Sequence, residues 1–180
     1  MVNSRDHALV DRCRNGDRQA LEALVGTYQK PVYNAAYRIL GNPDDAADVT
    51  QAAFLKAFEN LDGYDPKYKF FSWIYRIAVN ESINQLKRIR KQQPLDEGEA
   101  ADDPGPDDEV EAGNLSREIQ DGLMALNVEY RSVIVLRHFS DCSYRQISEI
   151  LQIPEKTVKS RLYSARQLMK DQLLANGIYL

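Results

Sequence analysis

The sequence has few of the residues that build metal centres, disulfide frameworks or membrane spans. Its two cysteines and two histidines are isolated from one another, so no CxxC or paired-histidine metal motif is present. We therefore expect reduced cysteines, no metal and no cofactor. The longest run of Val, Ile and Leu covers only residues 133–136, far short of a membrane span. Because the N-terminus is polar and lacks signal-peptide features, we predict a cytoplasmic protein with no membrane insertion.

Catalytic signatures are also lacking. The sequence has no glycine-rich phosphate loop, no evident nucleophile–base pair and no metal-ligand cluster, so we do not expect an enzyme. It has no internal repeat and no alternation of apolar and polar residues of the kind that indicates strands. The predicted fold class is all-α.

Charge is unevenly distributed along the chain, whose formal net charge is −4. Residues 1–93 carry 14 Lys/Arg and 11 Asp/Glu, and residues 115–180 carry 9 Lys/Arg and 7 Asp/Glu. Residues 94–114 carry nine acids and no base, together with Pro, Gly and Ala. Such a segment buries too little apolar surface to order itself. We predict two small helical domains, 1–92 and 115–180, joined by a flexible acidic linker at 93–114.

The chain is organised around a predicted helix-turn-helix at 143–169. A capping-box pattern, Ser143 with Gln146, starts a first helix, and Pro154 suits the first turn of a second. The second helix has an apolar stripe, and its other faces are basic and rich in hydroxyls. Such a helix suits the major groove of duplex DNA. The alternative is a helical hairpin with a solvated basic face. The predicted stripe is Val158, Leu162, Ala165, Met169 and Leu173.

In the first half, the pattern predicts helices that end at Asn15–Gly16, restart at Asp17, break at Pro31 and continue over 32–40 and 44–60. Over 44–60 the inward set is Ala46, Val49, Ala53, Ala57, Phe58 and Leu61. The outer face carries Leu55 among polar residues, which is a modest sign of a protein partner.

Residues 62–69 read as a loop, and residues 70–91 as a helix with an aromatic head and a basic tail. Phe70, Phe71, Trp73 and Tyr75 cannot all face one core, because successive helix residues lie about 100° apart. We therefore expect some of them near the surface beside cations, an arrangement that suits single-stranded nucleic acid. The alternative is that they pack a small helical core. In the second half, helices are predicted over 115–126 and 129–139.

Three stretches together resemble the extracytoplasmic-function (group IV, sigma-70 family) sigma factors of bacterial RNA polymerase. They are DVTQAAFLKAF at 48–58, FFSWIYRIAVN at 70–80 and TVKSRLYSAR at 157–166. The resemblance covers nearly the whole chain apart from the linker. It implies a sigma-2-like domain at 1–92 and a sigma-4-like domain at 115–180. The implied partners are core RNA polymerase, promoter DNA and an anti-sigma factor.

The resemblance also implies site residues. Those for the polymerase are Asp48, Gln51 and Leu55. Those for the melted, single-stranded −10 element are Tyr64, Lys67, Lys69, Phe71, Tyr75, Arg76 and Asn80. Those for the duplex −35 element are Tyr144, Arg145, Lys156, Thr157, Lys159, Ser160, Arg161, Ser164 and Arg166.

The implied function is promoter recognition, DNA melting and transcription initiation. The alternative is a helix-turn-helix regulator that acts without being a polymerase subunit. The sequence departs from the family pattern at four positions, Ala52, Asn127, Ser148 and Lys156, where an acid, a proline, an alanine and a glycine are usual.

Overall fold

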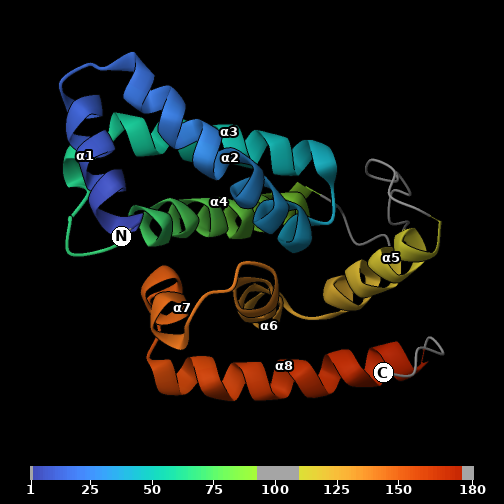
Figure 1. Ribbon diagram of the computed structural model, residues 1–180. Helices are drawn as coiled ribbons and strands as arrows, with labels where there is room; N and C mark the ends of the chain where they lie inside the picture. Colours follow the sequence, from blue (N-terminus) through green and yellow to red (C-terminus); the bar gives the residue numbers. More distant parts are fainter. Residues whose placement is uncertain (1, 93–109, 176–180) are drawn as a thin grey trace.

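The computed structural model describes residues 2–92 and 110–175, and every regular element there is helical. The all-α prediction is therefore confirmed. The first half consists of four α-helices with a short 3₁₀ turn before the last (Figure 1). These elements are α1 Val2–Arg14, α2 Arg18–Leu40, α3 Pro43–Glu59, η1 Leu61–Gly63 and α4 Phe70–Gln92.

The second half forms another layer against the first. In this half the segment η2 (Val135–Phe139) continues helix α6 (Val128–Ile134) as a wider π-helical turn, in which the Ser140 amide donates to the Val135 carbonyl at 3.1 Å. The elements are α5 Val110–Ala125, α6 Val128–Ile134, η2 Val135–Phe139, α7 Tyr144–Leu151 and α8 Glu155–Ala175.

Side-chain caps set several helix starts. The Asp17 carboxylate accepts hydrogen bonds from the amides of Gln19 and Ala20 at the start of α2, as predicted. Asn42 caps α3 in the same way, accepting from the Asp45 amide at 3.0 Å. Asn127 accepts from the Tyr130 amide at 2.9 Å and starts α6. The departure from proline at position 127 thus replaces a rigid helix start with a capping side chain.

The predicted break at Pro31 is wrong, since α2 runs through it from Arg18 to Leu40. A proline in a helix interior removes one backbone hydrogen bond and crowds the preceding turn. Here Tyr28 and Val32, on either side of it, are both buried in the core. Packing on this face holds the helix together across a residue that local preference would use to end it.

The second difference concerns the linker. The helix predicted from residue 115 already begins at Val110, so the last residues of the predicted linker are helical. The remainder, 93–109, lies outside the described residues. Polar and small residues such as Glu111 and Ala112 are good helix formers, and they extend α5 although they bring no bulky apolar side chain.

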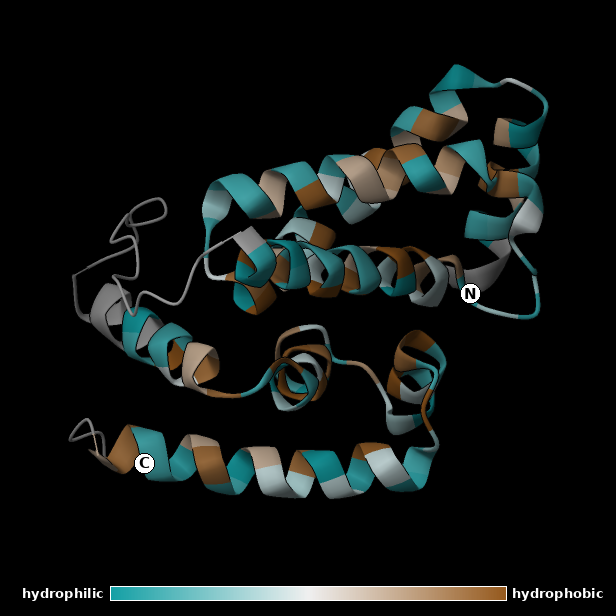
Figure 2. Cartoon of the chain, turned by 180° about the vertical axis from the view of Figure 1, so that it is seen from behind, coloured by the Kyte–Doolittle hydropathy of each residue, from teal (hydrophilic) through white to brown (hydrophobic). Residues whose placement is uncertain are grey.

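The expectation that some of the four aromatics of α4 lie near the surface is met only in part, by Phe71. Phe70, Trp73 and Tyr75 are buried, and Phe71 is half-buried. The reason is that α4 is covered on more than one side. It packs on α2 and α3 in its own layer and contacts α7 of the other layer (Figures 1 and 2). One hydrophobic core therefore extends through both halves, from Val10 to Ala165.

Candidate nucleic-acid interface

The predicted helix-turn-helix is present, and its turn is held by side-chain contacts. Ser143 and Gln146 form the predicted reciprocal capping box at the start of α7. Gln152 takes the left-handed conformation, with φ 53°, and ends α7. The Ser148 hydroxyl then donates to the Ile153 carbonyl at 2.6 Å, so the departure from alanine at 148 braces the turn. Pro154 precedes α8 directly, and its carbonyl accepts hydrogen bonds from the amides of Thr157 and Val158 in the first turn of that helix.

The apolar stripe of α8 faces the core as predicted: Val158, Leu162, Ala165 and Leu173 are buried, and Met169 is half-buried. The opposite side of α8 presents cations and hydroxyls. Lys156, Lys159, Ser160 and Arg166 are exposed, whereas Thr157, Arg161 and Ser164 are half-buried.

On α7, the half-buried Tyr144 ring lies near two cations, with the Lys159 ammonium 5.9 Å and the Arg137 guanidinium 5.5 Å from its centre. Arg145 is exposed and pairs with Glu149 at 3.2 Å. All nine predicted duplex-facing residues lie on α7 and α8, the two helices of the motif. Two of their cations already have partners from outside the motif.

The first is Arg161, whose guanidinium lies 2.6 Å from the Glu129 carboxylate of α6. The second is Arg166, whose Nε–H donates to His138 Nε2 at 3.2 Å. Burial, followed by the charges of Arg166 and Arg137, lowers the pKa of His138, and the neutral ring that results can accept this hydrogen bond.

The sequence interpretation missed Tyr163. Its side chain is 69% exposed on α8, among the cations and hydroxyls of the recognition face. It follows Leu162 of the apolar stripe by one residue, so helical geometry alone places it off the buried face.

The residues predicted for single-stranded DNA are divided between surface and core. Lys67, Lys69 and Asn80 are exposed, and Arg76 is half-buried. The Phe71 and Tyr75 rings lie 4.2 Å apart, centre to centre. Tyr75 is only 2% exposed, because Ser140 and Cys142 of the other half lie beside it. Burial raises the pKa of Tyr75 to about 12.

Tyr64 is a core residue in this conformation. Its ring packs on those of Phe70 and Trp73, and its hydroxyl donates to the Tyr68 carbonyl at 2.7 Å. His7 of α1 lies near the same ring, with ring centres 5.9 Å apart. Burial raises the pKa of Tyr64 to about 12. Contact with nucleic acid at Tyr64 would require loop 62–69 to move.

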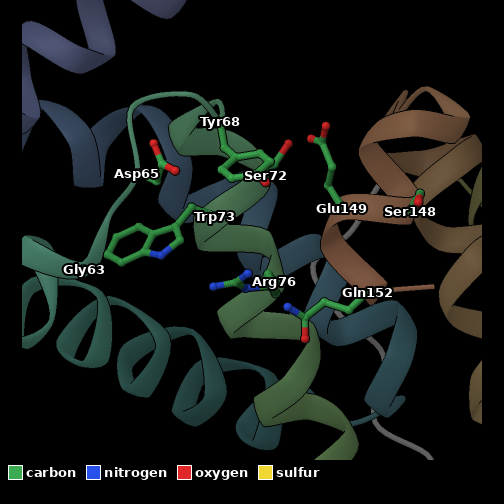
Figure 3. Close-up of a pocket in the computed structure, with 9 residues that line it drawn as sticks. All are labelled: Gly63, Asp65, Tyr68, Ser72, Trp73, Arg76, Ser148, Glu149 and Gln152. Atoms are coloured by element: carbon green, nitrogen blue, oxygen red, sulfur yellow. The ribbon is translucent and has the colours of Figure 1, made fainter. Parts of the chain in front are cut away.

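A cavity of about 300 Å³ lies between α4, its preceding loop and α7 (Figure 3). Tyr68, Ser72 and Arg76 line one side, and Glu149 and Gln152 line the other. Its full lining is Gly63, Asp65, Tyr68, Ser72, Trp73, Arg76, Ser148, Glu149 and Gln152.

The predicted polymerase-facing residues share one exposed face of α3. Asp48 and Gln51 are exposed, and Leu55 is 56% exposed. Beside them lies an apolar groove of about 1000 Å³ between α2 and α3, which the sequence interpretation missed. Phe58, predicted to point inward, is half-buried against the core, and Phe54 is buried in it; both side chains line this groove.

Among the described residues, no cluster of three or more His, Cys, Asp or Glu side chains is arranged to hold a metal ion. None of the helices in 2–92 and 110–175 is both long and apolar enough to cross a membrane. The helix-turn-helix, the cationic recognition face and the aromatic helix define a DNA-binding protein with two separate candidate DNA surfaces.

Comparisons with known proteins identify the family. Residues 24–92 match the model of sigma-70 region 2, and residues 116–169 match that of sigma-70 region 4. The chain is 35% identical to ECF RNA polymerase sigma factor SigW of Bacillus subtilis over 176 residues, which cover 91% of this chain and 94% of that one. It is 31% identical to the ECF RNA polymerase sigma-E factor of Escherichia coli over 184 residues, which cover 93% and 94% of the two chains.

Among solved structures, CnrH in complex with the cytosolic domain of CnrY is similar with a TM-score of 0.75 and 26% identity, covering 95% of this chain and 98% of that one. The chain belongs to the extracytoplasmic-function family of RNA polymerase sigma factors. Its partners are core RNA polymerase and promoter DNA, and its function is transcription initiation. Because the first half matches sigma-70 region 2, the alternative of a regulator outside the polymerase is not retained.

Proposed function

We propose that the sigma function is divided among three surfaces of this chain. In this proposal α8, with Tyr144 and Arg145 of α7, reads the duplex −35 element, and α4 with loop 62–69 holds the melted −10 strand. The face of α3 with Asp48, Gln51 and Leu55 docks on core polymerase. The corresponding domains are 1–92 and 115–180. The chain supplies no catalytic step and acts in the cytoplasm, where the polymerase works.

The observation that carries the proposal is the exposed cationic and hydroxyl face of α8 beside a braced turn. Lys159 and Ser160 are exposed there, while Val158 and Leu162 anchor the helix from behind. A helix held in this way presents side chains to base edges in the major groove, where one good bidentate contact discriminates bases by about 1–3 kcal/mol.

Single-strand binding by α4 is supported by the chemistry of its side chains. Aromatic faces stack on unpaired bases for about 1–3 kcal/mol each, and cations neutralise phosphates. Phe71 and Tyr75 supply the faces, Lys67 and Lys69 supply charge, and Asn80 supplies an amide that can read a base edge.

An anti-sigma factor is proposed as a third partner, because the resemblance implies one and because the similar CnrH forms a complex with the cytosolic domain of CnrY.

The test compares transcription by core polymerase with and without this protein on a promoter library, with permanganate reactivity of unpaired thymines as the measure of opening. We expect Lys159→Ala to weaken duplex binding and to have little effect on pre-melted templates. Asn80→Ala is expected to impair opening or relax −10 preference while duplex −35 binding persists. If both variants lose binding and opening in the same proportion on every template, the division of roles is wrong.

A further inference from the structure

The two tyrosines of the loop before α4 have opposite environments. Tyr64 is 3% exposed and belongs to the core, so its ring is covered by protein. Tyr68, which the sequence interpretation did not select, is 47% exposed. Its neighbours in the chain, Lys67 and Lys69, are exposed as well. An exposed ring flanked by two cations combines a face that can stack on an unpaired base with charge for the phosphates beside that base.

The start of this loop is held by α1. The Arg14 guanidinium at the end of α1 donates to the carbonyls of Leu61 and Tyr64, both at 3.0 Å. It also lies 3.8 Å from the Asp62 carboxylate and 3.3 Å from that of Asp11 in its own helix. Hydrogen bonds from an ionised donor are stronger than those between neutral groups. One side chain of α1 therefore fixes the path that the backbone takes as it leaves α3.

The backbone of Tyr68, near the other end of the loop, is also held. Its carbonyl accepts a hydrogen bond from the Tyr64 hydroxyl at 2.7 Å and lies 3.4 Å from His7 Nε2 of α1. Its amide donates to the Asp65 carbonyl at 3.1 Å. Because these contacts engage the polar backbone atoms and leave the side chain exposed, the loop holds the Tyr68 ring at the surface.

Tyr68 lies on the same wall of the 300 Å³ cavity as Ser72 and Arg76 of α4 (Figure 3). The Ser72 hydroxyl is buried, and within residues 2–92 and 110–175 it has no hydrogen-bond partner. Proteins that bind unpaired bases stack the ring on an aromatic side chain and hydrogen-bond its edge. The side chains around Tyr68 therefore suit an unpaired base, and contacts from α1 fix where Tyr68 stands.

Helix α1 lies outside the match to sigma-70 region 2, which begins at residue 24. We propose that α1 is nevertheless part of the −10 site. Arg14 and His7 are positioning residues that hold loop 62–69, and Tyr68, in place of Tyr64, is the loop residue that stacks on an unpaired base. A loop already held in its binding conformation loses less entropy when it meets the strand. The inference rests on the proposed role of α4 and this loop in holding the melted strand.

The test uses holoenzyme assembled from core polymerase and the full chain. Its probe is a promoter selected from the library and pre-melted over the −10 element. Tyr68→Ala removes the ring and Tyr68→Phe keeps it, whereas Arg14→Gln removes the charged contacts to the loop backbone. The matched control is Arg12→Gln, which makes the same charge change on α1, because Arg12 pairs with Asp17 at the start of α2, at 2.8 Å.

We expect Tyr68→Ala and Arg14→Gln each to weaken binding of the pre-melted template by about fivefold or more. Tyr68→Phe and Arg12→Gln should bind it as the wild type does. Because Arg14 acts through the loop, the double variant of Arg14→Gln with Tyr68→Ala should lose little more than Tyr68→Ala alone. All variants should keep their helical content and their affinity for core polymerase, which a general loss of structure would lower.

Unchanged binding of the pre-melted template by Tyr68→Ala would overturn the inference. Additive losses in the double variant would do so too, as would an equal loss of polymerase binding in Arg14→Gln. In these cases the proposed role of α4 still stands if Asn80→Ala impairs opening or relaxes the −10 preference. If Asn80→Ala changes neither, the role of α4 is wrong and the inference fails with it.

Discussion

Arg161 lies on the helix proposed to read duplex DNA, yet its guanidinium is already paired with the Glu129 carboxylate at 2.6 Å. A solvent-accessible ion pair of this kind is worth about 0.2–1 kcal/mol. A bidentate contact to a guanine edge is worth about 1–3 kcal/mol. Exchange of one partner for the other is therefore favourable, and Glu129 reduces the affinity of Arg161 for DNA without preventing the contact.

From this competition we expect Glu129→Gln to raise the affinity for a −35 duplex by about two- to fivefold, which corresponds to loss of the pair. Removal of any acid near DNA also raises affinity, so the matched control is Glu155→Gln, an exposed acid in the first turn of α8. Fluorescence anisotropy of each variant on cognate and mutated −35 sequences separates the loss of the Arg161–Glu129 pair from the general effect of removing an acid near DNA. An equal gain for both variants on both sequences would show that Arg161 reads no base.

Tyr75 gives a pH-dependent prediction. Burial raises the pKa of its hydroxyl to about 12, whereas an unfolded tyrosine titrates near about 10. Between these values the unfolded chain loses the proton first, so the stabilising contribution is complete below about pH 10 and is lost as pH rises toward 12. The free energy of unfolding, measured by urea titration, should fall across this window by up to about 1.4 kcal/mol per pH unit more in the wild type than in Tyr75→Phe. Identical pH dependence in the two proteins would contradict the burial of this hydroxyl.

Much of the site can be predicted at the residue scale, but burial cannot. Charged residues of α8 were placed correctly because a helix with an apolar stripe leaves only its other faces for cations. Tyr163 was missed although the same geometry exposes it. The Tyr64 ring lies near His7, which is distant in sequence, and no local pattern in loop 62–69 indicates that contact.

At the scale of elements, the most informative case is α2, which continues through Pro31. A proline in a helix interior costs about 3 kcal/mol relative to alanine. Because the side chain of Pro31 is exposed, Pro31→Ala removes this cost without opening a cavity. We expect a gain of up to about 3 kcal/mol in the free energy of unfolding, measured by urea titration. Lys30→Ala, at the neighbouring exposed position, should change stability little. A loss of stability in Pro31→Ala would mean that α2 needs a proline-dependent bend to pack.

The helix starts that were predicted correctly are those marked by a capping residue or a proline. Local hydrogen bonding indicates helix starts at Asp17 and Ser143, and fixed backbone geometry indicates one at Pro154. The structure has helices at all three places. The helix break predicted at Pro31 was wrong, because packing of Tyr28 and Val32 outweighs the local preference of proline to end a helix. The early start of α5 at Val110 was missed because a search for apolar spacing does not register a first turn made of small and polar residues.

The exposed face of α3 yields a prediction about the partner. Leu55 leaves more than half of its side-chain surface in water, beside Asp48 and an apolar groove. Asp48→Arg with Leu55→Ala should weaken binding to core polymerase at least about tenfold, because it removes an apolar anchor and reverses a charge. Circular dichroism should show unchanged helical content. Asp11→Arg makes the same charge change on α1 and serves as the control in the titration. Unchanged affinity of the double variant would remove α3 from the interface.

At the scale of the whole molecule, the docking of the two halves is what the sequence did not predict. Each half has its own helical periodicity, so two separate cores were expected. The four aromatics at 70–75 contained the relevant signal, since they cannot all face one core of a single layer. We interpreted this as surface exposure of some of them, whereas the structure satisfies it mainly by placing a second layer on α4. A single sequence does not distinguish an aromatic side chain that stacks on a base from one that packs against the other half of the same chain.

The acidic segment gives a prediction that concerns the charge of the entire protein. Residues 96–109 hold eight acids and no base, and their replacement by Ser and Gln would change the formal net charge from −4 to +4. We leave Glu111, which lies in α5, unchanged. The acids repel phosphates and oppose non-specific association of the free protein with DNA. The neutralised protein should bind a random-sequence duplex more tightly, with the largest gain at low salt.

The measurement is the affinity for that duplex as a function of salt concentration, since each phosphate that a cation neutralises steepens the dependence of log K on log salt. The control is a protein in which residues 94–109 are scrambled, which keeps length and charge but destroys any specific sequence. If charge alone acts, the scrambled protein matches the wild type, and only the neutralised protein gains affinity at low salt. A gain in both would instead point to specific contacts made by the segment, and a gain in neither would leave it only the role of a tether between the two DNA-facing halves.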